Sequence, residues 1–269
     1  MADSEHIYCY KYLPFDEGSR KVITEGTIKY TCPLDFNDPF DCWPCYSQEA
    51  LRELGQTKKK LIAQFGKSNG WSPAKRIREK RKLEAKVRQY IGTEKHQSDM
   101  LSQIGVVCLS RDPRNILMWS HYAKFHTGFV VEFKIPVFGY EEEAQKLGEN
   151  LIPFPITYSK KRPVIKYGKE NDEDLIDKSI LTKYIDWSYE KEQRVIEHLR
   201  GPGIHCYQRE SRLNSVISGM NISMENLKTL KNDVESIRKT PSLEHVKLYQ
   251  AEPSVIEYGV DIPGLERNF

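Results

Sequence analysis

The chain has 269 residues, 39% of them hydrophobic and 29% charged, and a formal net charge of +3 at pH 7. This length supports one large domain with a real core, and the composition excludes an intrinsically disordered chain. The longest apolar runs are too short to cross a bilayer, and the N-terminus has no basic region followed by an apolar stretch. We therefore expect a cytoplasmic protein with no membrane segment. The small net charge gives no global argument for nucleic-acid binding.

The chain begins with two predicted strands and a turn. Ile7–Leu13 (IYCYKYL) is rich in aromatic residues and ends at a proline, which predicts a strand, and Gly26–Thr31 predicts a second. In Phe36–Asp41 (FNDPFD) the Asn-Asp-Pro sequence favours a turn. We expect Phe36 and Phe40 to pin this turn to the core.

The cysteines give little indication of chemistry. Six are scattered through the chain, which fits reduced thiols. Cys42 and Cys45 have the spacing of a redox motif, but they do not follow a strand at the start of a βαβ unit. Because no second C-x-x-C completes a zinc site, we predict neither a metal site nor a redox role.

The segment 48–92 is basic and predicted to be helical. Between residues 58 and 90, 12 Lys and Arg residues face only Glu79 and Glu84. Gly66–Pro73 divides the segment into two helices, with Ser72 as an N-cap and Pro73 in the first helical position. We interpret it as an insert within a single domain, 1–269.

Two roles remain open for this basic insert. Its cations could contact a nucleic-acid or protein acceptor, a membrane surface or another acidic partner. They could instead form a solvated face whose Lys and Arg stems cover apolar surface. Few aromatic residues interleave with the charges, which favours the second interpretation.

The rest of the chain alternates irregularly between strands and helices. The predicted strands are 105–110, 127–133, 187–196, 214–218, 245–250 and 255–260. The predicted helices are 115–124, 141–150, 172–185 and 223–238, the last with Ser223 as its N-cap. This pattern predicts an α+β fold in which helices surround a mixed or antiparallel sheet.

The segment Trp187–Arg194 (WSYEKEQR) is the most informative in the chain. Glu190 and Glu192 are two residues apart, so in an extended strand both carboxylates would leave the same face. Such like charges repel unless a cation, a hydroxyl or a ligand lies between them, and Arg194 is a candidate cation. Alternatively, these three residues form a charged strand edge or a structural ion-pair network.

Several short motifs, taken together, resemble a bacterial protein family of unknown function. They are YKY at 10–12, FNDPFD at 36–41, CLS at 108–110, MWSHYA at 118–123 with His126 and Gly128, VEF at 131–133, and W-x-YE-x-E-x-R at 187–194. The resemblance spans nearly the whole chain and is weakest over the basic insert. It implies kinship and supplies no activity.

The order of three features is also similar to the pattern of the ADP-ribosyltransferase superfamily. These features are an early aromatic and basic strand, a middle strand that ends in Ser, and a late E-x-E pair. The resemblance implies that NAD (nicotinamide adenine dinucleotide) is the substrate, with Glu192 holding the nicotinamide ribose and Glu190 the acceptor. It implies further NAD contacts from Tyr10, Lys11, Tyr12, Ser110, His121, Tyr122 and Arg194.

Some of these positions have competing interpretations. Tyr10, Lys11 or Tyr12 would meet a phosphate or the adenine. His121 lies near the end of a predicted helix, where it could interact with the helix dipole or contact a ligand. The sequence departs from the superfamily pattern in the first motif, where Lys11 is the nearest cation and His6 is expected to precede the strand. No STS triplet occurs.

A fixed carboxylate suits this reaction because cleavage of the nicotinamide glycosidic bond builds positive charge on the sugar. A second carboxylate can orient or deprotonate the acceptor. We therefore expect an NAD-using effector, with a role in bacterial conflict as a toxin or in phage defence.

Two alternatives remain. One is a metal-dependent nuclease that uses Asp38, Asp41, Glu190 and Glu192 as metal carboxylates. The other is a non-enzymatic module that senses a ligand or binds a partner.

Overall fold

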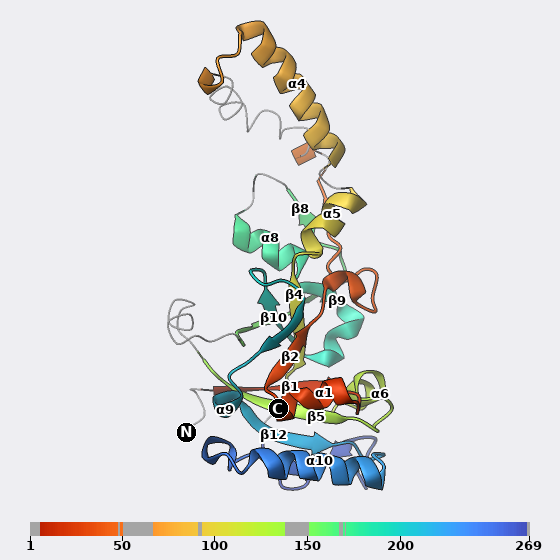
Figure 1. The fold of residues 1–269 in the computed structure, drawn as a ribbon. Helices are drawn as coiled ribbons and strands as arrows, with labels where there is room; N and C mark the ends of the chain where they lie inside the picture. Colours follow the sequence, from red (N-terminus) through yellow and green to blue (C-terminus); the bar gives the residue numbers. More distant parts are fainter. Residues whose placement is uncertain are drawn as a thin grey trace. The chain divides into compact units, whose positions relative to one another are not determined.

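The computed structural model describes residues 6–47, 49–50, 67–90, 93–137, 151–166, 169 and 171–267 (Figure 1). The chain forms two compact units. The first combines Met1–Thr31, Gly105–Ile156 and Asp186–Phe269, and the second combines Cys32–Ile104 and Thr157–Ile185. The predicted insert, 48–92, is part of the second unit. The predicted helix 141–150 and most of the predicted helix before residue 67 lie outside the described residues.

The first unit contains most of the strands. They are β1 (His6–Leu13), β2 (Thr27–Tyr30), β4 (Gly105–Ser110), β5 (Phe129–Pro136), β6 (Pro153–Pro155), β10 (Glu192–Glu197), β11 (Gly203–Cys206), β12 (Leu213–Ser218), β13 (Lys247–Gln250), β14 (Glu252–Pro253) and β15 (Val260–Asp261). Its helices are α1 (Glu17–Thr24), α6 (Ile116–Tyr122), α9 (Arg209–Arg212), α10 (Met224–Ile237) and the 3₁₀ helix η3 (Pro241–Leu243). The 3₁₀ helix η2 (Ile185–Glu190) leads into β10.

A seven-stranded sheet with the order β13-β12-β5-β1-β4-β10-β6 forms the centre of the first unit. Its neighbouring strands are antiparallel except β12 and β13, which are parallel. The predicted α+β fold with a mixed sheet is therefore confirmed. The central strands β4 and β5 are strongly buried, as their apolar content requires, and β1 buries Cys9, Tyr10 and Tyr12.

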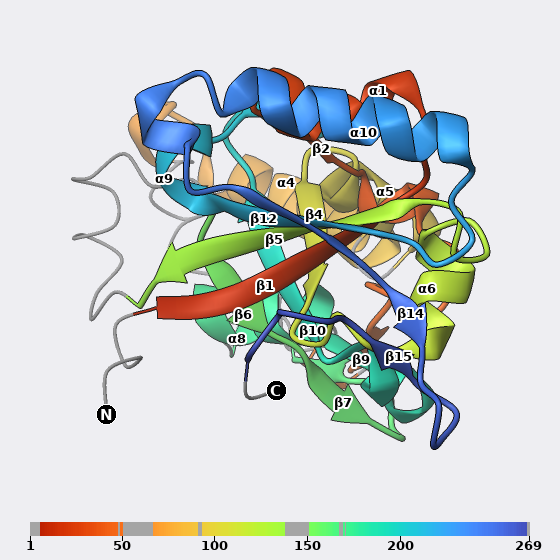
Figure 2. The ribbon, with the colours of Figure 1, turned by 90° about the horizontal axis from the view of Figure 1, so that it is seen from below.

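Side-chain alternation divides this sheet into two faces, each with its own apolar cluster. Cys9, Val107 and Val131 belong to one cluster, which also contains apolar side chains of α1 and α10. Figure 2 shows α1 and α10 side by side on one side of β1, β5 and β12. Tyr12 and Val130 belong to the cluster on the opposite face, with residues of α6 and of the C-terminal segment.

Polar caps begin several helices at the expected positions. The Ser223 side chain accepts a hydrogen bond from the Asn226 backbone N–H at 3.2 Å, which confirms the predicted start of α10. The Asn115 side chain accepts from the backbone N–H groups of Leu117 and Met118 at 2.9 and 3.1 Å and so begins α6. These caps satisfy backbone donors that have no partner within the first helical turn.

The second unit has short strands and separate helices. Its strands are β3 (Cys45–Tyr46), β7 (Thr157–Ser159), β8 (Val164–Ile165) and β9 (Thr182–Tyr184), in the parallel pairs β3–β8 and β7–β9. Its helices are the 3₁₀ helix η1 (Pro33–Asp35), α4 (Pro73–Tyr90), α5 (Glu94–Leu101) and α8 (Asp172–Ser179). The prediction that a helix begins at Pro73 behind Ser72 is confirmed, and the Ser72 hydroxyl accepts from the Lys75 N–H at 3.3 Å.

The predicted helix 172–185 is wrong beyond Ser179. The chain leaves the helix there and enters β9, whose backbone pairs with β7 over Thr157–Ser159. The Thr157 N–H donates to the Leu181 carbonyl at 2.8 Å at the start of this pairing. A neighbour distant in sequence thus satisfies backbone groups that the local pattern assigned to a helix.

Two further predictions fail at turns. The 36–41 turn forms, with the Asp38 carboxylate accepting from the Phe40 N–H at 2.9 Å, but Phe40 is 66% exposed and does not reach the core. The predicted strand 255–260 is a turn between β14 and β15, because the Ser254 N–H donates to the Gly259 carbonyl at 3.0 Å. Of that range only Val260 lies in a strand.

Candidate functional site

Five polar side chains lie in one line across the sheet of the first unit, one on each of five neighbouring strands. They are Glu192 on β10, Ser110 on β4, Tyr10 on β1, Glu132 on β5 and Ser215 on β12, and we call them the polar row. Directly opposite residues of neighbouring strands project from the same face. None of the five is more than 3% exposed. The row therefore brings together three residues predicted from separate motifs: Tyr10, Ser110 and Glu192.

Glu192 ends the row in a buried ion pair with Arg194. The Arg194 Nε donates to Glu192 Oε1 at 2.8 Å, and its Nη2 donates to Oε2 at 3.3 Å. The Arg194 side chain is fully buried. Arg194, one candidate cation for the glutamate pair, thus pairs with Glu192 on the same face of the strand. Burial, and next the charge of Glu192, raise the pKa of the neighbouring Cys108 thiol to about 12.

Ser110 ties the glutamate segment to the centre of the sheet. Its Oγ donates to the Glu190 carbonyl at 2.6 Å and lies 3.2 Å from the Asp112 carbonyl. It also accepts from the Asp112 N–H at 3.0 Å. A single hydroxyl therefore links β4, the loop after it and the end of η2. This arrangement holds the backbone of Glu190 against the end of β4.

Glu132 is the centre of a second part of the row that the sequence analysis did not single out. Its Oε1 accepts from the Tyr10 hydroxyl at 2.9 Å and from Arg267 Nε at 3.3 Å. Its Oε2 accepts from Ser215 Oγ at 2.7 Å and also from the Asn214 amide. A register shift between Leu213 and Ser215 brings Asn214 and Ser215 to the same carboxylate. The available signal was one glutamate in the otherwise apolar Phe129–Phe133 stretch.

Glu190 lies outside the strand that was predicted to carry it. Extended structure begins only at Glu192, because Glu190 ends η2 and Lys191 adopts a left-handed backbone with φ 44°. The Lys191 N–H closes the 3₁₀ turn on the Ser188 carbonyl at 3.2 Å. The prediction of a strand over 187–196 is therefore wrong before residue 192. The Glu190 carboxylate, which is buried, accepts from the Tyr122 hydroxyl at 2.7 Å.

Lys11 lies off the polar row. Its Nζ donates to the Cys108 carbonyl at 3.0 Å, and burial lowers its pKa. The alternation of β1 directs this side chain to the face opposite Tyr10. Lys11 therefore contacts the backbone of β4 and is not a member of the polar row.

Tyr12 and His121 also lie off the row. The Tyr12 hydroxyl donates to the Asp112 carbonyl at 2.7 Å, and its ring packs edge-on against Trp119. His121 is exposed in the last turn of α6, as the sequence predicts, and its ring lies at 69° to the Tyr122 ring with 6.3 Å between the ring centres.

An arginine-lined pocket opens beside the row. Its volume is about 630 Å³, and its walls come from His6 and Tyr8 of β1, Arg111 and Arg114, and the C-terminal residues 265–267. Arg267 joins the pocket to the row through Glu132, and its guanidinium lies 4.1 Å from the centre of the Tyr8 ring. The expectation that His6 precedes the first strand is wrong, because β1 begins at His6. We call this cavity the arginine pocket.

The MWSHYA motif ends in a strained turn. Lys124, Phe125 and His126 have φ values of 48°, 57° and 63°, a left-handed conformation that non-glycine residues rarely adopt. His126 Nε2 lies 3.2 Å from Ser120 Oγ, the His126 ring stacks on Trp119, and burial lowers the pKa of His126. The turn passes closely over β12, since a Cβ on Gly219 would lie 2.1 Å from the His126 carbonyl oxygen. A glycine is required there.

The predicted nuclease would need the carboxylates of Asp38, Asp41, Glu190 and Glu192 to bind a metal together. Asp38 and Asp41 belong to the second unit, whereas Glu190 and Glu192 belong to the first. Among the described residues, no three His, Cys, Asp or Glu side chains are grouped as metal ligands. Within the described part of the chain, Cys42 and Cys45 are not joined by a disulfide. Within the same described part of the chain, no helix is both long and apolar enough to cross a bilayer.

Comparison with known proteins gives one family. Residues 118–195 match the model of a family described as "Protein of unknown function (DUF2971)". No curated protein and no solved structure matches the chain. The matched segment begins at MWSHYA and ends within β10, so it contains both glutamates of the E-x-E pair and the tyrosine that contacts Glu190. Over this segment the chain is similar to a domain of unknown function, in agreement with the kinship expected from its motifs.

Proposed function

We propose that the first unit is an ADP-ribosyltransferase-like effector domain that uses NAD as its substrate. One observation carries this proposal: Tyr10, Ser110 and Glu192 come from three motifs far apart in sequence, yet they are consecutive in the polar row, with Ser110 between the other two. The resemblance described above requires these three motifs to meet at one site. A bacterial conflict or phage-defence role is part of the same proposal.

The chemistry needs a fixed negative charge, and Glu192 supplies one. When the glycosidic bond breaks, its electron pair leaves with nicotinamide and the ribose becomes cationic. Arg194 holds both Glu192 oxygens in one orientation, at 2.8 and 3.3 Å. A carboxylate held this way does not have to reorganise as the charge develops. Arg194 would thus act as a positioning residue.

Glu190 would serve the acceptor. The acceptor atom forms the new bond to the ribose carbon that nicotinamide leaves, and its proton passes to Glu190 or to solvent. The Tyr122 hydroxyl, 2.7 Å from Glu190 Oε1, would orient that carboxylate. Because Glu190 is held by a different backbone segment from Glu192, each carboxylate has its own fixed position. Water or a macromolecule could be the acceptor.

The arginine pocket would hold the diphosphate of NAD. Arg111, Arg114 and Arg267 line it, and guanidinium groups bind phosphate oxygens in pairs. These residues supply the cations that the first motif lacks. Replacing Arg111 with Ala should raise the KM for NAD by about 10- to 100-fold with little change in kcat, because a charge-assisted contact to bound substrate is lost. An unchanged KM would exclude Arg111 from NAD binding.

The deciding experiment measures release of nicotinamide from NAD by the purified chain, with and without a chelator. Nucleic acid and a cell extract are supplied as possible acceptors. The variants are Glu192→Gln and Glu192→Gln/Arg194→Gln, the second of which removes both buried charges together. Glu197→Gln is the matched control, since Glu197 lies at the far end of the same strand in an ion pair with Arg200.

We expect release that resists the chelator, is lost in both Glu192 variants and persists in Glu197→Gln. Release at the wild-type rate by the folded double variant would contradict the role given to Glu192. No release by the wild type with every acceptor would contradict the proposal as a whole. Cleavage of nucleic acid that requires a divalent metal would favour the nuclease instead.

A further inference from the structure

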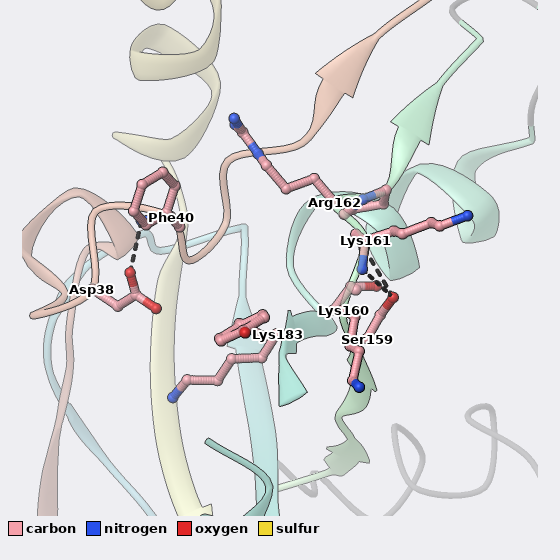
Figure 3. A pocket seen from close by; sticks show the side chains of 10 residues that line it. Asp38, Phe40, Ser159, Lys160, Lys161, Arg162 and Lys183 are labelled. Atoms are coloured by element: carbon pink, nitrogen blue, oxygen red, sulfur yellow. Dashed lines mark hydrogen bonds between the residues drawn. The ribbon is translucent and has the colours of Figure 1, made fainter. Parts of the chain in front are cut away.

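The second unit contains a small basic pocket that has no part in the proposed NAD chemistry. Its volume is about 260 Å³. Figure 3 shows Asp38 and Phe40 on one side, Ser159 to Arg162 on the other, and Lys183 between them. The segment 159–162 begins at the end of β7, and Lys183 lies on β9, so the β7–β9 pair sets the distance between this segment and Lys183. We call it the lysine pocket.

The cations of this pocket are of two kinds. Lys183 is buried and pairs with Asp41 at 3.6 Å, so it belongs to the pocket floor. Lys160 and Lys161 are exposed, and within the part of the chain that the structure describes neither forms an ion pair. Exposed Lys side chains with no internal partner can bind an external anion without losing an existing contact.

Arg162 is held in place by backbone and aromatic contacts. Its Nε donates to the Trp43 carbonyl at 2.9 Å, and its Nη2 donates to the same oxygen. The guanidinium carbon lies 6.0 Å from the centre of the Phe40 ring. These contacts use a neutral carbonyl and a ring, and among the described residues no carboxylate pairs with Arg162, which lines the pocket.

Two aromatic side chains accompany the cations. Phe40 is 66% exposed and Tyr184 is 46% exposed, and both line the pocket. The Asp38 carboxylate fixes the Phe40 backbone by accepting its N–H at 2.9 Å. Exposed aromatic rings beside Lys and Arg are the combination that binds single-stranded nucleic acid, since bases stack on the rings while cations contact phosphates.

The charge of the whole second unit favours the same partner. This unit has 21 Lys and Arg against 14 Asp and Glu, a net charge of +7, whereas the remaining residues sum to −4. The net charge of the chain, +3, therefore conceals a strongly basic unit. A basic unit attracts a polyanion and raises its rate of encounter.

We propose that the lysine pocket binds single-stranded nucleic acid. One unstacked base rests against Phe40 or Tyr184, and the flanking phosphates contact Lys160, Lys161 and Arg162. The pocket is small and concave, so it accepts an exposed base and excludes a duplex, whose bases are stacked inside. This binding is independent of the proposed NAD reaction, and its test requires no NAD.

The test measures binding of a fluorescent 12-nucleotide poly(dT) strand to the full chain by anisotropy, at several salt concentrations. Its competitors are the same strand in a duplex and heparin, a polyanion without bases. Two variants target the pocket: Lys160→Ala/Lys161→Ala for the phosphates and Phe40→Ala for the base. Matched controls are Lys67→Ala/Lys95→Ala, which removes two exposed charges of the same unit outside the pocket, and Leu34→Ala, which removes an exposed apolar side chain.

The two pocket variants should fail in different ways. Phe40→Ala should weaken binding about 5- to 150-fold with an unchanged salt dependence, because it removes stacking alone. Lys160→Ala/Lys161→Ala should weaken binding and reduce the slope of log K against log salt by about 1.4, at roughly 0.7 for each phosphate contact. The control variants should remain near the wild type.

Three results would overturn the proposal. If the duplex or heparin binds as tightly as the single strand, the surface recognises charge alone. If Phe40→Ala binds like Leu34→Ala, no base stacks on the ring. If the Lys67 and Lys95 pair matters as much as Lys160 and Lys161, the contact lies elsewhere on the unit. Far-ultraviolet circular dichroism of each variant verifies that it is folded.

Discussion

The two units of this protein use charged side chains in opposite ways. In the first unit, Glu132, Glu192 and Arg194 are buried and satisfied by one another or by hydroxyl, amide and guanidinium donors. In the second unit, Lys160 and Lys161 are exposed on the rim of a pocket and form no ion pair among the described residues. Buried charges are costly to desolvate and tolerate no misplacement, so they fix one arrangement of the sheet. Exposed charges add little to stability and are free for a partner.

This comparison predicts the largest stability loss at the Glu192–Arg194 pair. Replacing Glu192 with Ala leaves a fully buried guanidinium without its carboxylate, and we expect a loss of about 3 to 5 kcal/mol in the free energy of unfolding. Urea unfolding followed by circular dichroism measures it. Replacing both Glu192 and Arg194 with Gln should cost less than the single change, because no isolated charge remains. An additive double variant would show that the two side chains are not coupled.

The next effect is expected at the other end of the polar row. Tyr10→Phe removes the hydroxyl that donates to Glu132 Oε1 at 2.9 Å and keeps the ring in the core. A hydrogen bond to a buried carboxylate contributes about 1.5 to 3 kcal/mol. The free energy of unfolding should fall by this amount, and the urea midpoint should fall with it. Tyr258→Phe is the control, since its side chain is fully exposed. Equal midpoints for the two variants would contradict a structural role for the row.

A pH dependence should separate Lys11 from the lysines of the second unit. Burial lowers the pKa of Lys11 from its ordinary value of 10.5. At pH values between the lowered pKa of the folded chain and the ordinary pKa of the unfolded chain, the unfolded chain therefore binds more protons than the folded chain. Stability therefore rises with pH through that window. In a Lys11→Met variant this rise should be smaller. Unfolding by urea at several pH values from neutral to 10 tests it, and parallel curves for the two proteins would count against a lowered pKa.

The sequence predicted the framework of this fold better than its details. Strands such as Gly105–Ser110 and caps such as Ser223 follow local rules of alternation and hydrogen bonding, and both are confirmed. The end of α8 and the start of β10 were missed, because pairing with β7 and the left-handed backbone of Lys191 decide them. These depend on neighbours that are distant in sequence or on a rare conformation.

The same limit applied to the candidate site. Tyr10, Ser110 and Glu192 could be selected because each belongs to a motif, although only the strand register shows that they are neighbours. The residues of the arginine pocket were missed because Arg111, Arg114 and Arg267 come from two distant parts of the chain. Glu132 was missed because it is a single glutamate in the otherwise apolar Phe129–Phe133 stretch. Phe40 was assigned to the core because aromatic residues are usually buried, whereas the Asp38 turn directs it outward.

The smallest stability effect is expected in the second unit, at the exposed lysines on the rim of the lysine pocket. Replacing Lys160 and Lys161 with Ala should change the free energy of unfolding by no more than about 0.5 kcal/mol, since both side chains are exposed and lack ion-pair partners among the described residues. Lys183→Ala is the contrasting variant, because Lys183 is buried against Asp41 and its loss leaves a buried carboxylate with one partner fewer. Urea unfolding of the two variants side by side separates the rim of the pocket from its floor. If the rim lysines cost as much as Lys183, they serve the fold, and the division between charges that hold the structure and charges that await a partner no longer applies to this unit.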